Sequence, residues 1–548
     1  MEDRERRVRA DDAVAWVAGC GLIASSAALG AIATWWGGSW LTGLLQTLVV
    51  ACGLAGAAAM WRRTGPRTLV GVVVVAFVAR VVLVPWPPFQ SNDLYRYLWD
   101  GQVLARGLDP YVVVPSAPVL EALRGSDWLY PHIDWRDVPT LYPPLDLGFY
   151  ALGAFFGELA HRSVVPLKLI LLAGDALTIA LIARSLRARD LPTGRLAIYA
   201  WNPLAIVEFG LNGHEECIAI ACIVAAVVAL EAKRPLTAGI GFAGAVLSKL
   251  YPAAFVAALV AHRASRPAVF VCATLVIVAY VPFVVWNSDV LGFLHAFAFG
   301  YHFNDSLHRL VGTLGAAVLF AGALVVAAIE RRRGTSAIAV VLGLEVAYLL
   351  LSPNVYPWYI AIFPALLPLL GNAFSGAMRP LGVALIAWTA FAPLAYLAPW
   401  AMPTGSPLDV AAHVVEYAPL AIAALVYALR DWRRVAAALG IAAISGCGAR
   451  ASSIASAAAQ TSTVVRTVDA QRIAHGANFY RANCAICHTP TATSFVGPSL
   501  AHVAARRSRA SLRTHIATSV PGGATFSPAT IDALVNYLTV INERSSNP

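Results

Sequence analysis

Long apolar runs separated by short polar segments dominate most of the chain. The runs at 13–36, 41–60 and 164–184 are long enough to cross a bilayer, whose hydrocarbon core takes about 20 helical residues. A further crossing is expected near 68–85, whereas the run at 147–159 is too short and predicts an interfacial or re-entrant helix. The pattern therefore predicts an all-α, polytopic membrane protein.

Two stretches depart from this pattern. Residues 86–163 are polar, aromatic and irregular, so we expect an outer loop beyond the hydrocarbon, where unpaired backbone groups would be costly. After a membrane domain at 1–447, residues 448–465 are rich in Ala, Ser and Thr and predict a flexible linker. Residues 466–548 then predict a small soluble domain that is also all-α.

The composition supports the same class. The 548 residues are 59% hydrophobic and only 13% charged, whereas soluble domains carry about 25% charged residues. The net charge of +10 comes from basic residues that lie in short clusters between the apolar runs. Such clusters are typical of topology signals, so no nucleic-acid partner is expected.

The basic clusters also predict an orientation. Arg4, Arg6, Arg7 and Arg9 precede the first apolar run, which predicts a cytoplasmic N-terminus. The later clusters fall on the same side if alternate runs cross, and about fifteen runs then leave the C-terminal end outside. We expect a multi-pass protein of a bacterial inner (plasma) membrane with an extracytoplasmic C-terminal domain.

The C-terminal domain contains a Cys-X-X-Cys-His motif. Cys484, Cys487 and His488 have the spacing that attaches haem c covalently and supplies an axial ligand to its iron. Bacterial haem c is attached outside the cytoplasm, which agrees with the side that the basic clusters predict. We therefore expect a covalent haem c, with His488 as a ligand of the iron.

Polar and aromatic patches interrupt the membrane domain on its predicted outer side. The first is the stretch from Ser91 to Gly101, SNDLYRYLWDG. The others are Asp109-Pro110-Tyr111, Tyr142-Pro143-Pro144, Trp201-Asn202-Pro203 with Glu208, Asn212-Gly213-His214-Glu215-Glu216, Ser248-Lys249-Leu250-Tyr251-Pro252, Leu351-Ser352-Pro353 and Tyr356-Pro357-Trp358-Tyr359.

In content and order these patches resemble the GT-C superfamily of polytopic glycosyltransferases, in particular its mannosyltransferase-like branch that uses polyprenyl-phosphate sugars. The resemblance implies transfer of a mannose-like hexose at the membrane surface, from a lipid-linked donor to a glycan or lipid acceptor. By position, Asp93 would be the catalytic base for the acceptor. The family pattern often has a second acid where this chain has Asn92, and an Asp where it has Glu216.

The chemistry of such a transfer suggests further site residues. A leaving phosphate needs cationic partners, for which Lys249, His214 and Arg96 are the candidates, and Tyr356 is a candidate substrate contact. Simpler readings stay open: Arg96 would form a surface pair with Asp93, Lys249 would extend to the interface, and Tyr356 would belong to an aromatic belt.

Other acidic and metal-binding readings are weaker. A divalent metal beside His214, Glu215 and Glu216 stays open, although the second His of a zincin helix is missing. Asp175 and Glu345 lie inside apolar runs, where we expect buried hydrogen-bonding groups.

The C-terminal domain resembles class I cytochrome c, with the haem motif after a first helix and an apolar closing helix. That resemblance implies a Met as sixth ligand before the last helix, but residues 520–526 contain none. His502 or His515 would have to replace it, or the iron site is open. Residues 444–447 also resemble a lipobox, which would make Cys447 a lipidation site.

Two functions from different classes follow. The first is a membrane glycosyltransferase that carries a haem c module and works with an unknown redox partner. The alternative is a membrane-anchored c-type cytochrome that acts in electron transfer or ligand binding, with the membrane part as its anchor.

Overall fold

The computed structural model describes residues 2–36, 40–126, 128–286, 289–396 and 407–430, together with eight positions of the C-terminal part. The chain divides into two compact units, Met1–Arg430 and Asp431–Pro548. The predicted linker, Cys447 and the haem motif at 484–488 lie outside the described residues.

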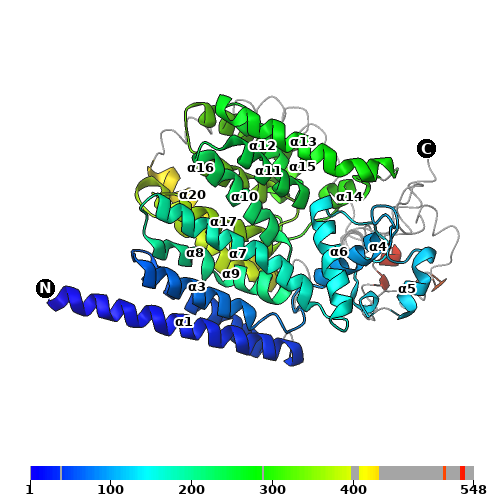
Figure 1. Cartoon of the computed structure of the whole chain (residues 1–548), viewed down its shortest axis with the longest axis horizontal. Coiled ribbons are helices and arrows are strands. Elements are labelled where there is room, and N and C mark those ends of the chain that lie inside the picture. The colour runs from blue at the N-terminus through cyan, green and yellow to red at the C-terminus, as the bar shows by residue number, and fades with distance from the viewer. Residues whose placement is uncertain are drawn as a thin grey trace, which may run out of the picture. The chain divides into compact units, whose positions relative to one another are not determined.

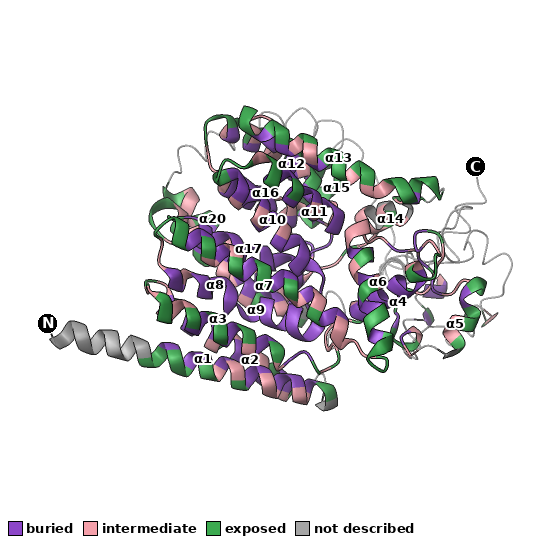
Figure 2. Cartoon of the chain, in the orientation of Figure 1, coloured by how far each residue is buried: buried purple, intermediate pink, exposed green. Residues whose placement is uncertain are grey.

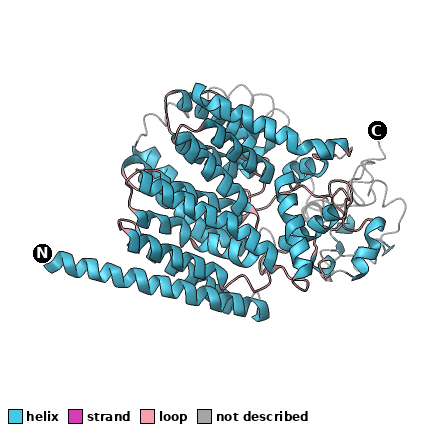
Figure 3. Ribbon diagram, viewed as in Figure 1, coloured by secondary structure: helices cyan, strands magenta, loops and turns pink. Residues whose placement is uncertain are grey.

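Helices make up the first unit (Figure 3), and its described residues contain no strand beyond an isolated bridge between Phe303 and Asn354. The all-α prediction is therefore confirmed. The first ten α-helices are α1 (Glu2–Trp36), α2 (Trp40–Met60), α3 (Pro66–Val81), α4 (Asp93–Ala105), α5 (Glu121–Ser126), α6 (Pro144–Leu159), α7 (Val165–Ala188), α8 (Ala197–Ala200), α9 (Pro203–Ile206) and α10 (Glu216–Glu231).

The remaining elements complete the unit. Further α-helices are α11 (Pro235–Ser248), α12 (Pro252–Leu259), α13 (Arg266–Val285), α14 (Gly292–Gly300), α15 (Leu307–Arg332), α16 (Ala337–Leu351), α17 (Ile362–Leu366), α18 (Arg379–Phe391) and α20 (Pro407–Arg430). The 3₁₀ turns are η1 (Pro118–Leu120), η2 (Tyr130–His132), η3 (Thr193–Leu196), η5 (Arg263–Ser265), η6 (Pro357–Ala361), η7 (Leu367–Leu369), η8 (Gly376–Met378) and η9 (Ala392–Tyr396), and η4 (Val207–Asn212) is a π-helical turn.

Seven helices of the described residues are long and apolar enough to cross a membrane, which makes the chain a multi-pass membrane protein. They are 13–34, 40–60, 165–188, 263–285, 307–332, 376–396 and 410–430. Three shorter apolar helices accompany them, at 235–248, 337–351 and 357–369. Large apolar side chains are exposed along α13 and α15, as expected for surfaces that face lipid (Figure 2).

Two of the predicted runs have shorter helices than a full crossing needs. The run near 68–85 contains α3, which ends at Val81 because a turn leads from there toward Pro85. The run at 147–159 lies in α6, which has 16 residues, so it is not among the seven long helices, as predicted. The membrane side of each loop stays a prediction from the basic clusters.

The segment at 86–163 contains α4, α5 and α6 with irregular chain between them, where an irregular loop with one helix at 147–159 was expected. Its helices α4, α5 and α6 lie together at one end of the long helices (Figure 1). Charged groups of α4 are buried yet paired, since Arg96 forms an ion pair of 2.8 Å with Asp100. Internal pairing of this kind lets a polar sequence form a packed helical layer.

Gly101 marks the closest approach of α4 to α6. A Cβ atom added at Gly101 would overlap the backbone carbonyl of Tyr150. Gly101→Ala is therefore expected to lower stability by about 1–3 kcal/mol, because backbone cannot move aside as a side chain does. Thermal unfolding in detergent measures the loss. Gly148→Ala, in the same segment but with open space around the added carbon, is the matched control and should unfold like the wild type.

The second unit is described at few positions. Ala510, Ser511 and Arg513 are helical, as are residues 531–532 and 534–536. Ile531, Leu534 and Val535 are buried, and an ion pair of 3.0 Å joins Arg513 to Asp532. Residues 531–532 and 534–536 are helical within the stretch where the closing helix was predicted.

Candidate active site

Asp93 stands at the first position of α4, where the preceding chain orients it. Its backbone N–H donates to the Ser91 hydroxyl at 3.2 Å, and the Asn92 amide donates to the Asp134 carboxylate at 3.2 Å. A carboxylate in a first helical turn is favoured by the helix dipole. The Asp93 side chain keeps 34% of its surface exposed, so substrate can reach it.

His214 faces Asp93 from another part of the chain. Its Nε2 lies 3.9 Å from an Asp93 oxygen, and its Nδ1 lies 2.9 Å from a Glu208 oxygen. His214 and Glu208 are both buried, and Nε2 has no hydrogen-bond partner. The three side chains form a carboxylate–imidazole–carboxylate row whose only accessible end is Asp93.

The local backbone explains why this row forms. Glu208 is the second residue of the π-helical turn η4, and Gly213 adopts a left-handed φ of 72° that turns the chain back. The His214 N–H therefore donates to the Glu208 carbonyl at 3.0 Å. The buried Lys168 ammonium donates to the carbonyls of Leu211 and Trp86. The turn is therefore held by hydrogen bonds at its end as well as within it.

Asn212 connects this turn to the segment that carries Asp93. Its carbonyl oxygen accepts from the backbone N–H groups of Phe89 and Gln90, each at 3.2 Å. Its amide donates to Glu208 at 2.9 Å. One side chain thus fixes the distance between the Asp93 segment and the Glu208–His214 pair.

Aromatic rings cover the buried side of His214. Trp358 stacks on the imidazole with centroids 3.7 Å apart, and Tyr356 stacks on Trp358 at 4.6 Å. The Tyr396 hydroxyl donates to the second Glu208 oxygen at 2.9 Å. Glu208 therefore accepts hydrogen bonds from three side chains, which satisfies a buried polar group.

Lys249 lies in an adjacent charged cluster. Its ammonium is 2.6 Å from Glu215 and 3.2 Å from Glu216, and it lies 5.1 Å from the centre of the Tyr359 ring. Both carboxylates are buried. Lys249 is therefore paired rather than extended to the interface.

Burial and neighbouring charges shift the pKa values of Asp93 and His214. Burial raises the pKa of Asp93, against the opposing charge of His214. Burial alone would lower the pKa of His214, but the hydrogen bond to Glu208 and the charges of Glu208 and Asp93 raise it overall. These interactions therefore favour the protonated form of the His214 imidazole.

Most of the predicted site residues converge here. Asp93, His214, Lys249 and Tyr356 gather around one region, since Asp93 lies 3.9 Å from His214 and interacts electrostatically with Lys249 and Tyr356. Arg96 is placed differently: its guanidinium is occupied by Asp100 and by the carbonyls of Trp135 and Val138. It is not a surface pair with Asp93, and it fastens the loop that precedes α6.

The sequence-based expectation assigned no role to several side chains that hold the site together. Lys168 and Tyr396 act through partners 43 and 188 residues away, so local spacing gives no signal for them. Asp175, in contrast, is a buried hydrogen-bonding group as expected, paired with Arg80 and accepting from Tyr199 at 2.6 Å. Glu345 is equally buried, and its carboxyl group interacts with Tyr251.

Fold and site define a polytopic helical membrane protein with a buried acid–imidazole row at one end of its helices. Residues 13–266 match the family model of the Alpha-(1->6)-mannopyranosyltransferase, N-terminal domain. That match contains Asp93, Glu208, His214 and Lys249, while Tyr356 lies beyond it. The predicted resemblance to mannosyltransferases is thus supported for the N-terminal part of the chain.

Curated relatives point the same way. A probable alpha-(1->6)-mannopyranosyltransferase of Mycolicibacterium smegmatis is 28% identical over 27% of this chain and 28% of its own. Alpha-(1->6)-mannopyranosyltransferases A and B of Corynebacterium glutamicum are 29% and 28% identical, each over 33% of this chain and over 35% and 33% of their own lengths. The chain spans about a third of the length of these relatives.

The C-terminal part has a match of its own. Residues 471–538 match the family model of Cytochrome C oxidase, cbb3-type, subunit III, and the stretch includes Cys484, Cys487 and His488. No solved structure matches the chain.

Proposed function

We propose that the chain is a membrane mannosyltransferase that takes its sugar from a polyprenyl-phosphate donor on the extracytoplasmic side of a bacterial inner membrane. The row of Asp93, His214 and Glu208 carries the proposal, because it presents one accessible carboxylate against a buried, oriented imidazole. The family match over 13–266 supports the sugar, and the apolar helices around the site suit a lipid-linked donor.

In this proposal Asp93 is the base. Its carboxylate takes the proton of the acceptor hydroxyl while the acceptor oxygen bonds to the anomeric carbon of the donor. The bond from that carbon to the phosphate oxygen breaks, and the phosphate leaves with the electron pair. His214, held by Glu208, keeps the Asp93 carboxylate oriented and balances its charge.

The leaving phosphate needs positive charge nearby, which we assign to Lys249 and His214. The Lys249 ammonium lies 2.6 Å from Glu215 and 3.2 Å from Glu216. An oxygen of the leaving phosphate would replace the longer contact, the one with Glu216. Tyr356, half-buried in the ring stack on His214, would help to shape the sugar pocket. Arg96 would act indirectly, by positioning the loop that follows α4.

The second part of the proposal is a haem c module. Cys484 and Cys487 would hold the porphyrin through thioethers and His488 would ligate the iron, a donor set that suits covalent haem. Haem there would supply one-electron chemistry or bind a small ligand. The match of residues 471–538 favours this module, and it also favours a second candidate function, a cytochrome for which the membrane part is an anchor.

One experiment separates the two candidates. Full-length protein in nanodiscs is given radiolabelled polyprenyl-phosphate mannose with a membrane glycan extract as acceptor, and a pyridine haemochrome spectrum is recorded on the same sample. Transfer above that of empty nanodiscs supports the transferase. A haem signal without any transfer favours the anchored cytochrome, and transfer without haem removes the haem module.

The pH dependence of transfer follows from Asp93. Because burial raises its pKa, the base becomes protonated and inactive at a higher pH than an ordinary Asp, whose pKa is about 3.9. We expect kcat/KM to fall as the pH is lowered through this raised value. Initial rates across the acid range measure it, and an acid limb at or below about 3.9 would contradict the assignment.

A further inference from the structure

A second cluster of chemically active side chains lies between α14 and α15. The segment 301–306 leaves α14, pairs with Asn354 through Phe303 and enters α15 at Leu307. Asn304 has a left-handed φ of 53°, which bends the segment so that His302 and Asp305 face each other. His308, on the first turn of α15, completes the group.

The bend is fixed from outside by α20. The Asn304 amide donates to the Glu416 carboxylate at 2.9 Å, and its carbonyl oxygen lies 3.1 Å from His413. The Tyr417 hydroxyl donates to the Asn304 backbone carbonyl at 2.8 Å. The cluster is therefore built on a restrained turn.

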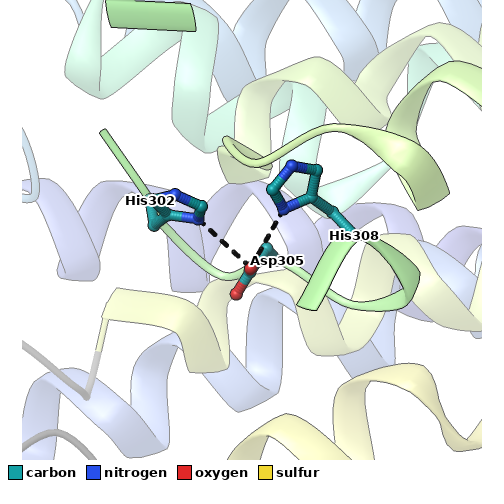
Figure 4. Close-up of side chains that lie close together, drawn as sticks. All are labelled: His302, Asp305 and His308. Atoms are coloured by element: carbon teal, nitrogen blue, oxygen red, sulfur yellow. Dashed lines mark hydrogen bonds and ion pairs between the residues drawn. The ribbon is translucent and has the colours of Figure 1, made fainter. Parts of the chain in front are cut away.

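The three side chains converge on one point (Figure 4). Nδ1 of His302 lies 3.4 Å, and Nδ1 of His308 lies 3.5 Å, from the same Asp305 oxygen. One ligand atom from each residue lies within 4.8 Å of the others. The second Asp305 oxygen is held by Arg309 at 2.9 Å, which leaves the first one directed at the imidazoles.

The burial of the cluster is informative. His308 and Asp305 each expose 5% of their side chains, whereas His302 exposes 49%. Nδ1 of His308 is buried, points at this group and has no hydrogen-bond partner of good geometry. A buried imidazole nitrogen whose one contact is this long is poorly satisfied, which favours a ligand that the three residues share.

We propose that His302, Asp305 and His308 bind a divalent transition-metal ion of the Zn²⁺ type. Two imidazole nitrogens and one carboxylate oxygen are a donor set that Zn²⁺ accepts, with a fourth position left for water. Arg309 orients the carboxylate from behind, as outer partners of metal ligands commonly do. The exposed side of His302 gives the ion its access from solvent.

Position suggests what the ion would do. Phe303, next to His302, stacks on Tyr356 at 4.6 Å, and Tyr356 stacks through Trp358 on His214. A metal at 302–308 would fix the outer end of this ring stack without touching the reacting groups. The inference concerns a site separate from the Asp93 row, and it holds whether or not the chain transfers mannose.

The test uses Zn²⁺ alone. Full-length protein in nanodiscs is stripped with EDTA, equilibrated with Zn²⁺ in a competing chelator, and its bound zinc is measured by mass spectrometry. We expect about one more zinc per chain in the wild type than in His302→Ala, whose affinity should fall by at least about 10-fold. His302 is half exposed, so its replacement leaves the fold intact.

Two comparisons keep the test decisive. His161→Asn, at an exposed histidine in another loop, should bind zinc like the wild type. In Co²⁺-loaded protein, the visible bands of a nitrogen- and oxygen-ligated ion should disappear in His302→Ala and persist in His161→Asn. Equal zinc in the wild type and His302→Ala, or none in either, would overturn the proposal and leave Asp305 neutralised by Arg309 alone.

Discussion

Replacing Asp93 by Asn is expected to lower the rate of mannose transfer by about 10²- to 10⁴-fold, the usual contribution of a positioned base. Asn has the same size, and Asp93 is partly exposed at a helix start, so the fold should persist. The loss should therefore appear in kcat more than in KM. Initial rates with labelled donor, on membranes with matched protein content, measure it.

The matched control is Asp137→Asn. Asp137 lies in the same segment, is exposed and accepts from the Ser116 hydroxyl rather than from the neighbours of Asp93. It should retain most of the activity. If Asp93→Asn transfers mannose as fast as Asp137→Asn, the base is another group and the proposed mechanism is wrong.

Glu208→Gln should have an effect of similar size, about 10²- to 10⁴-fold on kcat, although Glu208 itself is out of reach of substrate. The carboxylate accepts from His214, Asn212 and Tyr396, and a Gln amide can accept at only one of its two ends. The imidazole then loses both its orientation and the charge that keeps it protonated. Rates and thermal unfolding, measured on the same preparations, separate the two consequences.

Glu158→Gln serves as the control for this change. Glu158 accepts from Gln102 at 3.0 Å within the α4–α6 layer and has no part in the row. It should keep both activity and stability. A Glu208→Gln protein that unfolds like the wild type and transfers at full rate would show that the Glu208–His214 pair is merely structural.

The membrane class of the protein could be predicted from its sequence because bilayer thickness imposes a length on every apolar run. The length of α2 and the shortness of α6 agree with that rule. The helix α4 does not follow from it, because α4 depends on the pairing of Arg96 with Asp100 and on the contact with α6 that Gly101 permits. The hydrophobic periodicity of the sequence does not predict contacts of this kind.

The candidate site was predicted in part for the same reason. Asp93, His214 and Lys249 were predicted because each lies in a short polar patch, and the order of these patches resembles that of a known superfamily. The roles of their partners depend on distance in the fold: Tyr396 reaches Glu208 across 188 residues, and Asn212 reaches Phe89 across 123. The residues of the cluster at 302–308 are close in the sequence, but their side chains converge only because the chain bends at Asn304.

The π-helical turn η4 makes the number of residues in this stretch as important as their identity. A π turn accommodates one residue more than an α turn, and each residue of an α-helix advances the chain by about 100°. Removing one residue between Glu208 and Asn212 would restore ordinary helical bonding and yet rotate His214 away from both Glu208 and Asp93. The number of residues in this stretch is therefore as constrained as the identity of the charged residues. A one-residue deletion there is expected to abolish transfer although every charged side chain of the site is still present.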